Sequence, residues 1–419
     1  MTDSVTAGGL AAIQIRQGNP DFLDLPWGLP LDRWDTEKCP RLVQVSRGLS
    51  RHTVLFVGYG PAIYALKELP EPVGQREYDL LRVLEERRLP AVSPVGLART
   101  RPGEAGAGER QVLVTRHLDG SLPYRALFVQ QGLERYRERL LDAMAGLLVR
   151  LHLAGFFWGD CSLSNTLFRR DAGELQAFAV DAETSEAHER LTDGQRLLDL
   201  EIMEENVTGE LADVAAMASP PPSLSDLETG ASTRHRYERL WAETTRELSV
   251  APTESYRVHE RIRALNELGF SVSEIELVAS EDGRQLRLRT IVTDRDYHRH
   301  ALHGLTGVVA GERQAALMLN EIRALQGTMS PALGQSAPLG VAAFRWLEER
   351  FAPAVEKLRA RFGPAADTAE LYCQVLEQKW FLSEQAKKDV GLERALEEYL
   401  AHAAGQDLVS PVAIDEDRD

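Results

Sequence analysis

Three polar residues between positions 160 and 181 have the types and the spacing of a phosphate-transfer site. Asp160 follows Trp158-Gly159, Asn165 lies five positions after it, and Asp181 follows an apolar run at 177–180. Phosphate transfer to a hydroxyl needs a carboxylate to accept the hydroxyl proton, an amide oxygen for one magnesium ion, and a second carboxylate for magnesium at the phosphates. We therefore predict that Asp160 is the catalytic base and that Asn165 and Asp181 bind magnesium.

The elements around these residues follow from the periodicity of the chain. Apolar residues recur at helical spacing from Leu133 to His152, which predicts a buried helix that leads into the loop of Asp160. The segments after Asn165 and before Asp181 are short and extended, and a polar turn separates them. This pattern predicts a hairpin that joins the two magnesium ligands.

An upstream lysine, Lys67, fits the same chemistry. It ends the strand-like run Ala-Leu-Lys, which is close to the Val-Ala-Ile-Lys form whose ammonium contacts the phosphates of ATP. A solvated lysine at a strand end is the commoner case, but the order of Lys67 and the downstream residues favours the ATP-binding role. A helix predicted at 75–84 places Glu77 in its first turn as the partner of Lys67. Glu71 is the rival, disfavoured because a proline flanks it on each side.

The loop that covers the phosphates is predicted between the first two strands of a meander. β-Branched runs and tight turns predict three strands, at 42–45, 53–57 and 62–67. The loop at 47–51 contains Gly48 and Ser50, and we assign both to ATP binding through the backbone N–H groups and the Ser50 hydroxyl. The glycine pair at 58 and 60 is rejected as a nucleotide loop because no helix follows it.

The order of these motifs resembles that of the protein-kinase-like superfamily. Trp-Gly-Asp-x-x-x-x-Asn and Val-Asp-Ala-Glu stand where protein kinases have His-Arg-Asp-x-x-x-x-Asn and Asp-Phe-Gly. The form is more similar to lipopolysaccharide kinases and aminoglycoside phosphotransferases, and it looks most like a bacterial family with a C-terminal domain of unknown function. The resemblance spans about 150 residues. It implies ATP and Mg²⁺ as cofactors and a hydroxyl acceptor as substrate.

The length and the motif order predict an α+β chain with a bilobal protein-kinase-like fold, followed by a smaller α+β and helical accessory domain. With 419 residues, the chain exceeds the size of a single core. A Pro- and Ser-rich cluster marks the boundary between the two halves. We predict a strap at 1–40, an N-lobe at 41–118, a C-lobe at 119–218, a linker at 219–233, an accessory domain at 234–410 and an acidic tail at 411–419.

The second half carries weaker signals. A hairpin is predicted from strand-like runs at 275–278 and 286–292, and further helices are predicted at 312–326 and 341–402. The three histidines between 298 and 303 favour a solvated helix start over a metal site, because no cysteine lies near them. The acidic residues of a helix at 197–218 favour a solvated face over a substrate site. The expected core anchors are Trp346, Phe351, Trp380 and Phe381.

Charge and composition exclude several classes of function. The net charge of −16 disfavours a nucleic-acid partner, because binding a polyanion relies on Lys and Arg neutralising phosphates. Three scattered cysteines fit a reducing cytoplasm better than a disulfide framework. No window approaches the roughly 20 apolar residues of a membrane span, and the N-terminus has no export signal. We therefore expect a cytoplasmic protein without a membrane span.

The predicted function is transfer of the γ-phosphoryl group of ATP to a hydroxyl, with sugar, glycan, small-molecule and protein acceptors all open. The alternative is a nucleotide-binding pseudokinase or regulatory scaffold that acts through its C-terminal domain. The single glycine of the phosphate loop favours that alternative. The presence of Asp160 opposes it, because a protein that only binds ATP has no need of a catalytic base. Transfer of the nucleotide itself would use the same residues.

Overall fold

The N-lobe is built on one antiparallel sheet of five strands in the order β1-β4-β5-β3-β2. The computed structural model describes residues 9–45, 51–101, 109–129, 134–217, 229–246, 248–250, 271–279, 286–294, 296–333, 337–363 and 366–402. The strands of the N-lobe sheet are β1 (Leu10–Ile15), β2 (Val54–Tyr59), β3 (Ala62–Pro70), β4 (Ser93–Thr100) and β5 (Arg110–Arg116).

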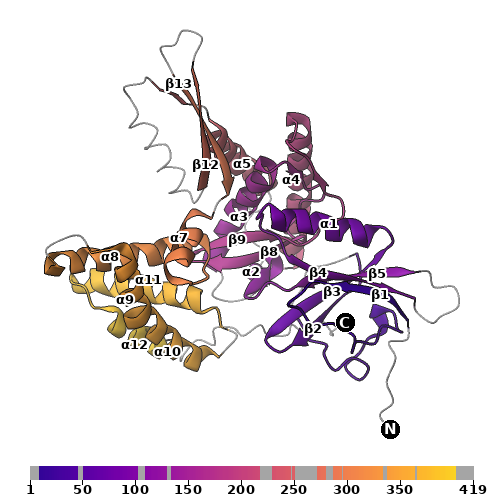
Figure 1. Cartoon of the computed structure of the whole chain (residues 1–419), viewed down its shortest axis with the longest axis horizontal. Coiled ribbons are helices and arrows are strands. Elements are labelled where there is room, and N and C mark those ends of the chain that lie inside the picture. The colour runs from indigo at the N-terminus through magenta and orange to yellow at the C-terminus, as the bar shows by residue number, and fades with distance from the viewer. Residues whose placement is uncertain are drawn as a thin grey trace.

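Helix α1 (Val73–Glu86) covers one face of this sheet, and the chain from 16 to 45 covers the other (Figure 1). Successive side chains of a strand point to opposite faces, so β5 serves both layers. Leu113 packs with the helix side, whereas Val112 and Val114 pack with the buried aromatic residues of the strap. The expected extended strap is therefore part of the N-lobe core.

The edges of the sheet differ from the sequence expectation. The strand expected at 42–45 is reduced to a single bridge between Leu42 and Val57, and β1 forms the far edge beside β4. Gly96 permits this pairing, because a Cβ atom there would lie 2.3 Å from the Gln14 carbonyl oxygen. The N-lobe thus begins with β1, and the boundary predicted at 41 is wrong.

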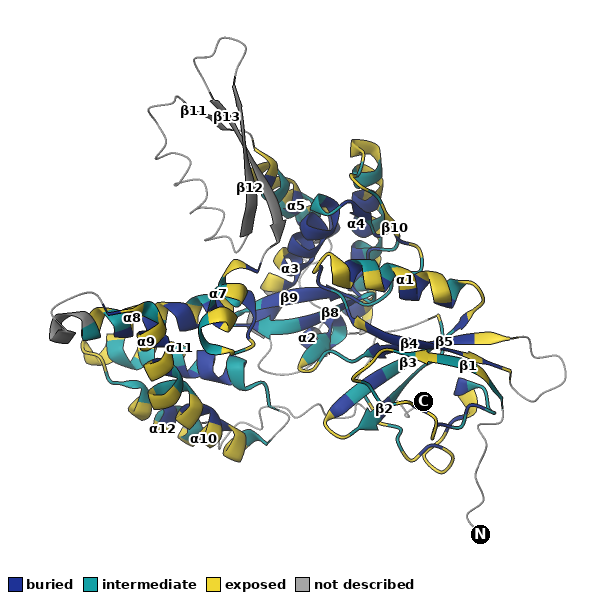
Figure 2. Cartoon of the chain, in the orientation of Figure 1, coloured by how far each residue is buried: buried dark blue, intermediate teal, exposed yellow. Residues whose placement is uncertain are grey.

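The C-lobe combines short strands with long helices. Strands β6, β8 and β9 form a three-stranded sheet, and β7 pairs with β10. The expected helix before the catalytic loop is α3, and the expected hairpin is β8 with β9. Figure 2 shows the buried residues concentrated along α3, β8 and β9. The elements are β6 (Ser121–Pro123), α2 (Tyr124–Val129), α3 (Glu134–Leu153), β7 (Phe156–Phe157), β8 (Thr166–Asp171), β9 (Glu174–Ala179), β10 (Glu186–Ala187) and α4 (Asp193–Met217).

Helix α5 (Thr229–Thr245) begins inside the segment expected to be a linker. It packs against α3 and α4, and Tyr237 is fully buried in the C-lobe core. Small residues allow this close packing, since a Cβ atom on Gly230 would lie 2.4 Å from the Glu204 carbonyl oxygen. The described end of the predicted linker, from Thr229 on, is therefore helical and packs on the C-lobe, so the start of the accessory domain predicted at 234 lies inside a helix.

The remaining elements make up the C-terminal domain: its helices lie beside the C-lobe in Figure 1, whereas its sheet contacts α3 and α5 of the C-lobe. The expected hairpin is present as β12 paired with β13, and β11 pairs with the other edge of β13. Apart from this sheet, the described part of the domain is helical. Its elements are β11 (Leu248–Val250), β12 (Ser271–Ala279), β13 (Leu286–Asp294), α7 (Tyr297–Thr306), α8 (Glu312–Leu333), α9 (Leu339–Trp346), a π-helical turn (Leu347–Phe351), α10 (Ala352–Phe362), α11 (Thr368–Ala386) and α12 (Leu392–His402).

Two of the four expected aromatic anchors of this domain are on its surface. Trp346 is fully buried and Phe351 packs against it, as expected. Trp380 is 65% exposed and Phe381 is 49% exposed, so these two assignments are wrong. Successive residues of a helix point about 100° apart, so the three apolar residues at 380–382 cannot all face the same core. Leu382 is the residue of this run that packs inward.

No helix within the described ranges is long and apolar enough to cross a membrane.

Candidate active site

A cavity of about 360 Å³ collects the residues predicted to do the chemistry. The residues before β2 contribute its N-lobe side, and the loop after β7, the end of β9 and helix α4 contribute the rest. The structure thus brings Asp160, Asn165 and Asp181 into one cavity, although 21 positions separate the first from the last. Its lining residues are Arg51, His52, Asp160, Ser162, Ser164, Asn165, Asp181, Asn206 and Glu210.

Lys67 connects the two lobes at this cavity. Its Nζ atom lies 3.0 Å from Glu77 Oε2 on α1 and 2.6 Å from Asp181 Oδ2 after β9. The expected contact between Lys67 and Glu77 is present, while Glu71 is exposed ahead of α1. Glu77 is fully buried, and burial together with the charge of Asp181 raises its pKa to about 8, although Lys67 opposes the rise. The ammonium is therefore shared between carboxylates of both lobes.

The carboxylate of Asp160 is held by hydrogen bonds on both oxygens. Oδ2 accepts from Arg51 Nη2 at 2.9 Å and from Asn165 Nδ2 at 3.1 Å, and Oδ1 accepts from Asn206 Nδ2 at 3.3 Å. Asn165 Nδ2 also donates to the Asp160 carbonyl oxygen. Because the nitrogen of the Asn165 amide points to Asp160, its oxygen is the atom left for a cation.

The first half of the chain matches the model of the lipopolysaccharide kinase (Kdo/WaaP) family over residues 62–219. This match covers 158 of the 419 residues. Residues 239–403 match a domain of unknown function (DUF4032), whose start falls within α5. No curated protein matches the chain.

Two solved structures are similar to parts of this chain. A structure described as WaaP in complex with acyl carrier protein has 15% identity and a TM-score of 0.33, and the match covers 61% of this chain and 98% of that chain. The BubR1 kinase domain has 16% identity and a TM-score of 0.28, with 36% and 49% of the two chains covered.

Glu183 lies at this candidate site and was not predicted. Its carboxylate lies 3.0 Å from His52 Nε2, 3.4 Å from Arg51 Nη2 and 3.6 Å from Lys67 Nζ. Carboxylate oxygens of Glu77, Asp181 and Glu183 all lie within 4.8 Å of one another. The sequence could have indicated Glu183 as a site residue, because it lies two residues after Asp181 in Asp-Ala-Glu.

This donor set fits magnesium. Mg²⁺ is a hard cation that takes oxygen ligands, and the cavity offers carboxylates and the Asn165 amide oxygen. Lys67 contacts all three carboxylates and Arg51 contacts Glu183, so the cluster is negative when all three carboxylates are ionised. A divalent cation bound beside Asp181 would compensate that charge.

A buried aspartate on α4, Asp199, fixes the loop of Asp160. It accepts hydrogen bonds from the backbone N–H groups of Trp158 at 2.8 Å and Gly159 at 2.9 Å. Its Oδ2 also lies 3.0 Å from His152 Nε2, and His152 Nδ1 lies 2.8 Å from the Tyr237 hydroxyl. His152 is thus a packed histidine, as expected, and helix α5 supports the loop through it.

Glu210 shows that the acidic face of α4 is not all solvated. Its carboxylate accepts from the backbone N–H groups of Leu163 at 2.7 Å and Ser164 at 3.0 Å, and also from the Ser164 hydroxyl. Burial raises the pKa of Glu210, while these hydrogen bonds oppose the rise. For Glu210 the expected solvated face is wrong, because the loop between Asp160 and Asn165 folds onto it.

Two predicted ATP-binding residues, Gly48 and Ser50, lie outside the described residues. Arg51, at the end of the same predicted loop, is described and reaches Asp160 and Glu183.

The three histidines considered as a metal site, His298, His300 and His303, belong to α7. His298 Nδ1 lies 2.6 Å from Glu312 Oε1. Glu312 also accepts the backbone N–H groups of His298 and Arg299, so it caps α7.

Proposed function

We propose that this chain transfers the γ-phosphoryl group of ATP to a hydroxyl acceptor in a magnesium-dependent reaction. The observation that carries the proposal is Lys67, held between Glu77 at 3.0 Å and Asp181 at 2.6 Å at the edge of a cavity that also contains Asp160. An ammonium in this position can contact phosphates on one side while the glutamate holds it on the other.

Each residue has a role that its contacts support. Lys67, braced by Glu77, binds the phosphates, and Asn165 and Asp181 hold magnesium, which neutralises charge on the phosphates when it is bound. Asp160 orients the acceptor hydroxyl and accepts its proton. Gly48 and Ser50 remain predicted contacts of ATP. Catalysis of this kind depends mostly on positioning and charge neutralisation.

The acceptor is a hydroxyl of a sugar, a glycan, a small molecule or a protein. Several acidic side chains line or approach the cavity, and these disfavour an anionic group near the reacting hydroxyl. We place the reaction in the cytoplasm, since Cys39, Cys161 and Cys373 are all free and buried.

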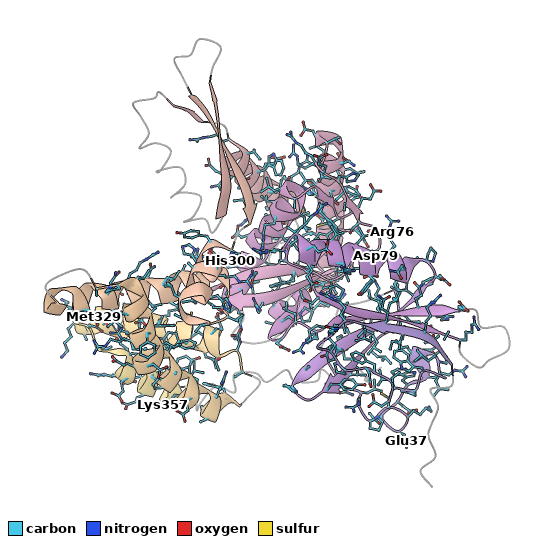
Figure 3. The ribbon with its side chains drawn as sticks, viewed as in Figure 1. Glu37, Arg76, Asp79, His300, Met329 and Lys357 are labelled. Atoms are coloured by element: carbon cyan, nitrogen blue, oxygen red, sulfur yellow. The ribbon has the colours of Figure 1, made fainter. Side chains whose placement is uncertain are left out.

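Asp160→Asn tests the proposal, because it keeps the shape of the side chain and removes the base. Turnover of γ-labelled ATP with a mixture of hydroxyl acceptors should fall by roughly 10²–10⁴, while ATP–magnesium affinity stays within a few-fold. Asp79→Asn is the matched control, because Asp79 lies on the exposed face of α1 (Figure 3). Turnover that survives in Asp160→Asn would contradict the catalytic role, and ATP binding without turnover in the wild type would favour a nucleotide-binding scaffold.

A further inference from the structure

The turn of the β8–β9 hairpin is bound by the C-terminal domain. Asp171 Oδ1 accepts the backbone N–H of Gln314 at 2.9 Å, and Asp171 Oδ2 accepts that of Arg313 at 3.1 Å, so it caps the start of α8. The next residue, Ala172, donates its backbone N–H to Glu370 Oε2 at 2.7 Å. Residues far apart in the chain thus converge on one turn.

Glu370, on α11, is the centre of this contact. It is fully buried, and its carboxylate accepts from the Tyr136 hydroxyl of α3 at 2.7 Å and from Gln314 Nε2 at 2.9 Å. Gln314 Nε2 also donates to the Arg170 carbonyl oxygen of β8 at 3.1 Å. Burial acts to raise the pKa of Glu370, but hydrogen bonds such as that from Tyr136 and the charge of Arg170 outweigh it and lower the pKa. The ionised carboxylate therefore ties α3, β8 and α8 to α11.

The other end of the same hairpin carries the candidate magnesium ligands. Asn165 directly precedes β8, and Asp181 lies two residues beyond β9. The backbone of Val180 donates to the Asn165 carbonyl oxygen at 3.0 Å, so the two ligand-bearing ends are paired. Unbroken antiparallel pairing joins the two ends of the hairpin, from Thr166 with Ala179 to Asp171 with Glu174, so we expect a shift at the turn to move the residues at the open end.

We propose that Glu370 is a positioning residue for the phosphotransfer site, and that the C-terminal domain sets the placement of Asn165 and Asp181 by holding the hairpin turn. The inference rests on the proposed function. We call the contacts that Glu370 and the start of α8 make with this turn, at Asp171 and Ala172, the hairpin clamp. Through this clamp the C-terminal domain would influence catalysis without contacting ATP or the acceptor.

The test compares Glu370→Gln with Glu384→Gln, an exposed residue of the same helix α11. Hydrogen exchange of residues 166–179 should become faster in Glu370→Gln alone, because the clamp loses its charged acceptor. The magnesium concentration for half-maximal turnover should rise about tenfold, as when a partner of a metal ligand is removed, while the KM for ATP at saturating magnesium changes less. A residue that only supports stability would not separate these two constants.

Tyr136→Phe is the second variant, because it removes one hydrogen bond to Glu370 and keeps the ring in the core. It should shift exchange and magnesium dependence in the same direction by a smaller amount, and it decides the matter if Glu370→Gln does not fold. Unchanged exchange, or faster exchange with unchanged magnesium dependence, would overturn the clamp. If the wild type shows no turnover, the proposed function fails, and the clamp is then judged by exchange and by the magnesium dependence of ATP binding.

Discussion

At the scale of single residues, the charge around Lys67 most constrains the chemistry. Glu77, Asp181 and Glu183 surround one ammonium, and Glu183 also contacts His52 and the Arg51 guanidinium. Burial, and to a smaller extent the like charge of Asp181, raises the pKa of Glu77. A bound magnesium ion would offset the charge of these carboxylates, and the cluster is therefore suited to a charged ligand with its counterion.

Lys67 and Glu77 are expected to act as a unit in ATP binding. Lys67→Ala and Glu77→Gln should each weaken ATP affinity, and the double mutant should lose less than the sum, because each residue holds the other in place. Calorimetric titration of ATP into the wild type, the two single mutants and the double mutant gives the coupling free energy. Glu86→Gln is the control, since Glu86 is exposed on the same helix. Strictly additive losses would show that the observed contact does not serve ATP.

Asp181 is expected to account for the magnesium dependence of ATP binding. In Asp181→Asn, ATP affinity should be nearly the same with and without magnesium, whereas the wild type should bind more tightly with the metal. Four titrations, of two proteins with and without magnesium, measure this. Equal affinities in all four would end the assignment of Asp181 as a metal ligand, and retained dependence in the mutant would transfer it to Glu183.

At the scale of elements, the stability of the contact between Asp171 and the start of α8 depends on pH. Burial raises the pKa of Asp171 to about 6 from an ordinary 3.8; the backbone N–H groups of Gln314 and Arg313 oppose the rise, and the charge of Glu370 adds to it. A folded-state pKa above the unfolded value means that the folded chain binds the proton more tightly. The stabilisation from protonated Asp171 is therefore complete below about pH 4 and is lost as the pH rises through about 6.

Asp171→Asn is expected to remove this pH dependence. Between about pH 4 and pH 7, the wild type should lose roughly 3 kcal/mol of unfolding free energy relative to the mutant, which corresponds to a shift of about two pKa units. Denaturant unfolding of both proteins across this range, followed by a probe in the C-terminal domain, measures the difference. Parallel curves for wild type and mutant would show that Asp171 titrates near its ordinary pKa.

At the scale of the whole molecule, the C-lobe and the C-terminal domain meet at helix α5, which contacts β13, and at the hairpin clamp. Tyr237 of α5 stacks on Trp241 and reaches the loop of Asp160 through His152 and Asp199. The second half of the chain therefore supports both the loop of Asp160 and the hairpin that joins Asn165 to Asp181. We propose that the division between the two halves falls after α5 and not before it.

Two truncations are expected to differ in stability for this reason. A chain that ends at Met217 lacks the buried Tyr237 and should melt well below a chain that ends at Arg246, because loss of one large buried aromatic side chain alone costs about 3–5 kcal/mol. Thermal unfolding of the two fragments, with the full chain alongside, measures the effect. Equal melting temperatures would place α5 outside the folding unit of the C-lobe.

The sequence by itself determined the local parts of this site. Asp160, Asn165 and Asp181 lie within 22 residues, and the elements between them depend on short-range turn and periodicity signals, which is why α3 and the β8–β9 hairpin were predicted. The pairing of Lys67 with Glu77 also follows from one strand and the next helix. Nearby residues of regular elements have few ways to meet, so their spacing is informative.

Only the tertiary structure decided the contacts between distant segments and the faces that they cover. Asn206 and Glu210 reach the site because α4 crosses the loop after β7, and no periodicity of α4 states which neighbour it meets. Trp380 is exposed and Glu370 is buried on the same helix, because the hairpin turn and α8 cover one side of α11 and not the other. Apolar pattern shows that a helix has a face to bury, but the burial of any one residue depends on which element packs there.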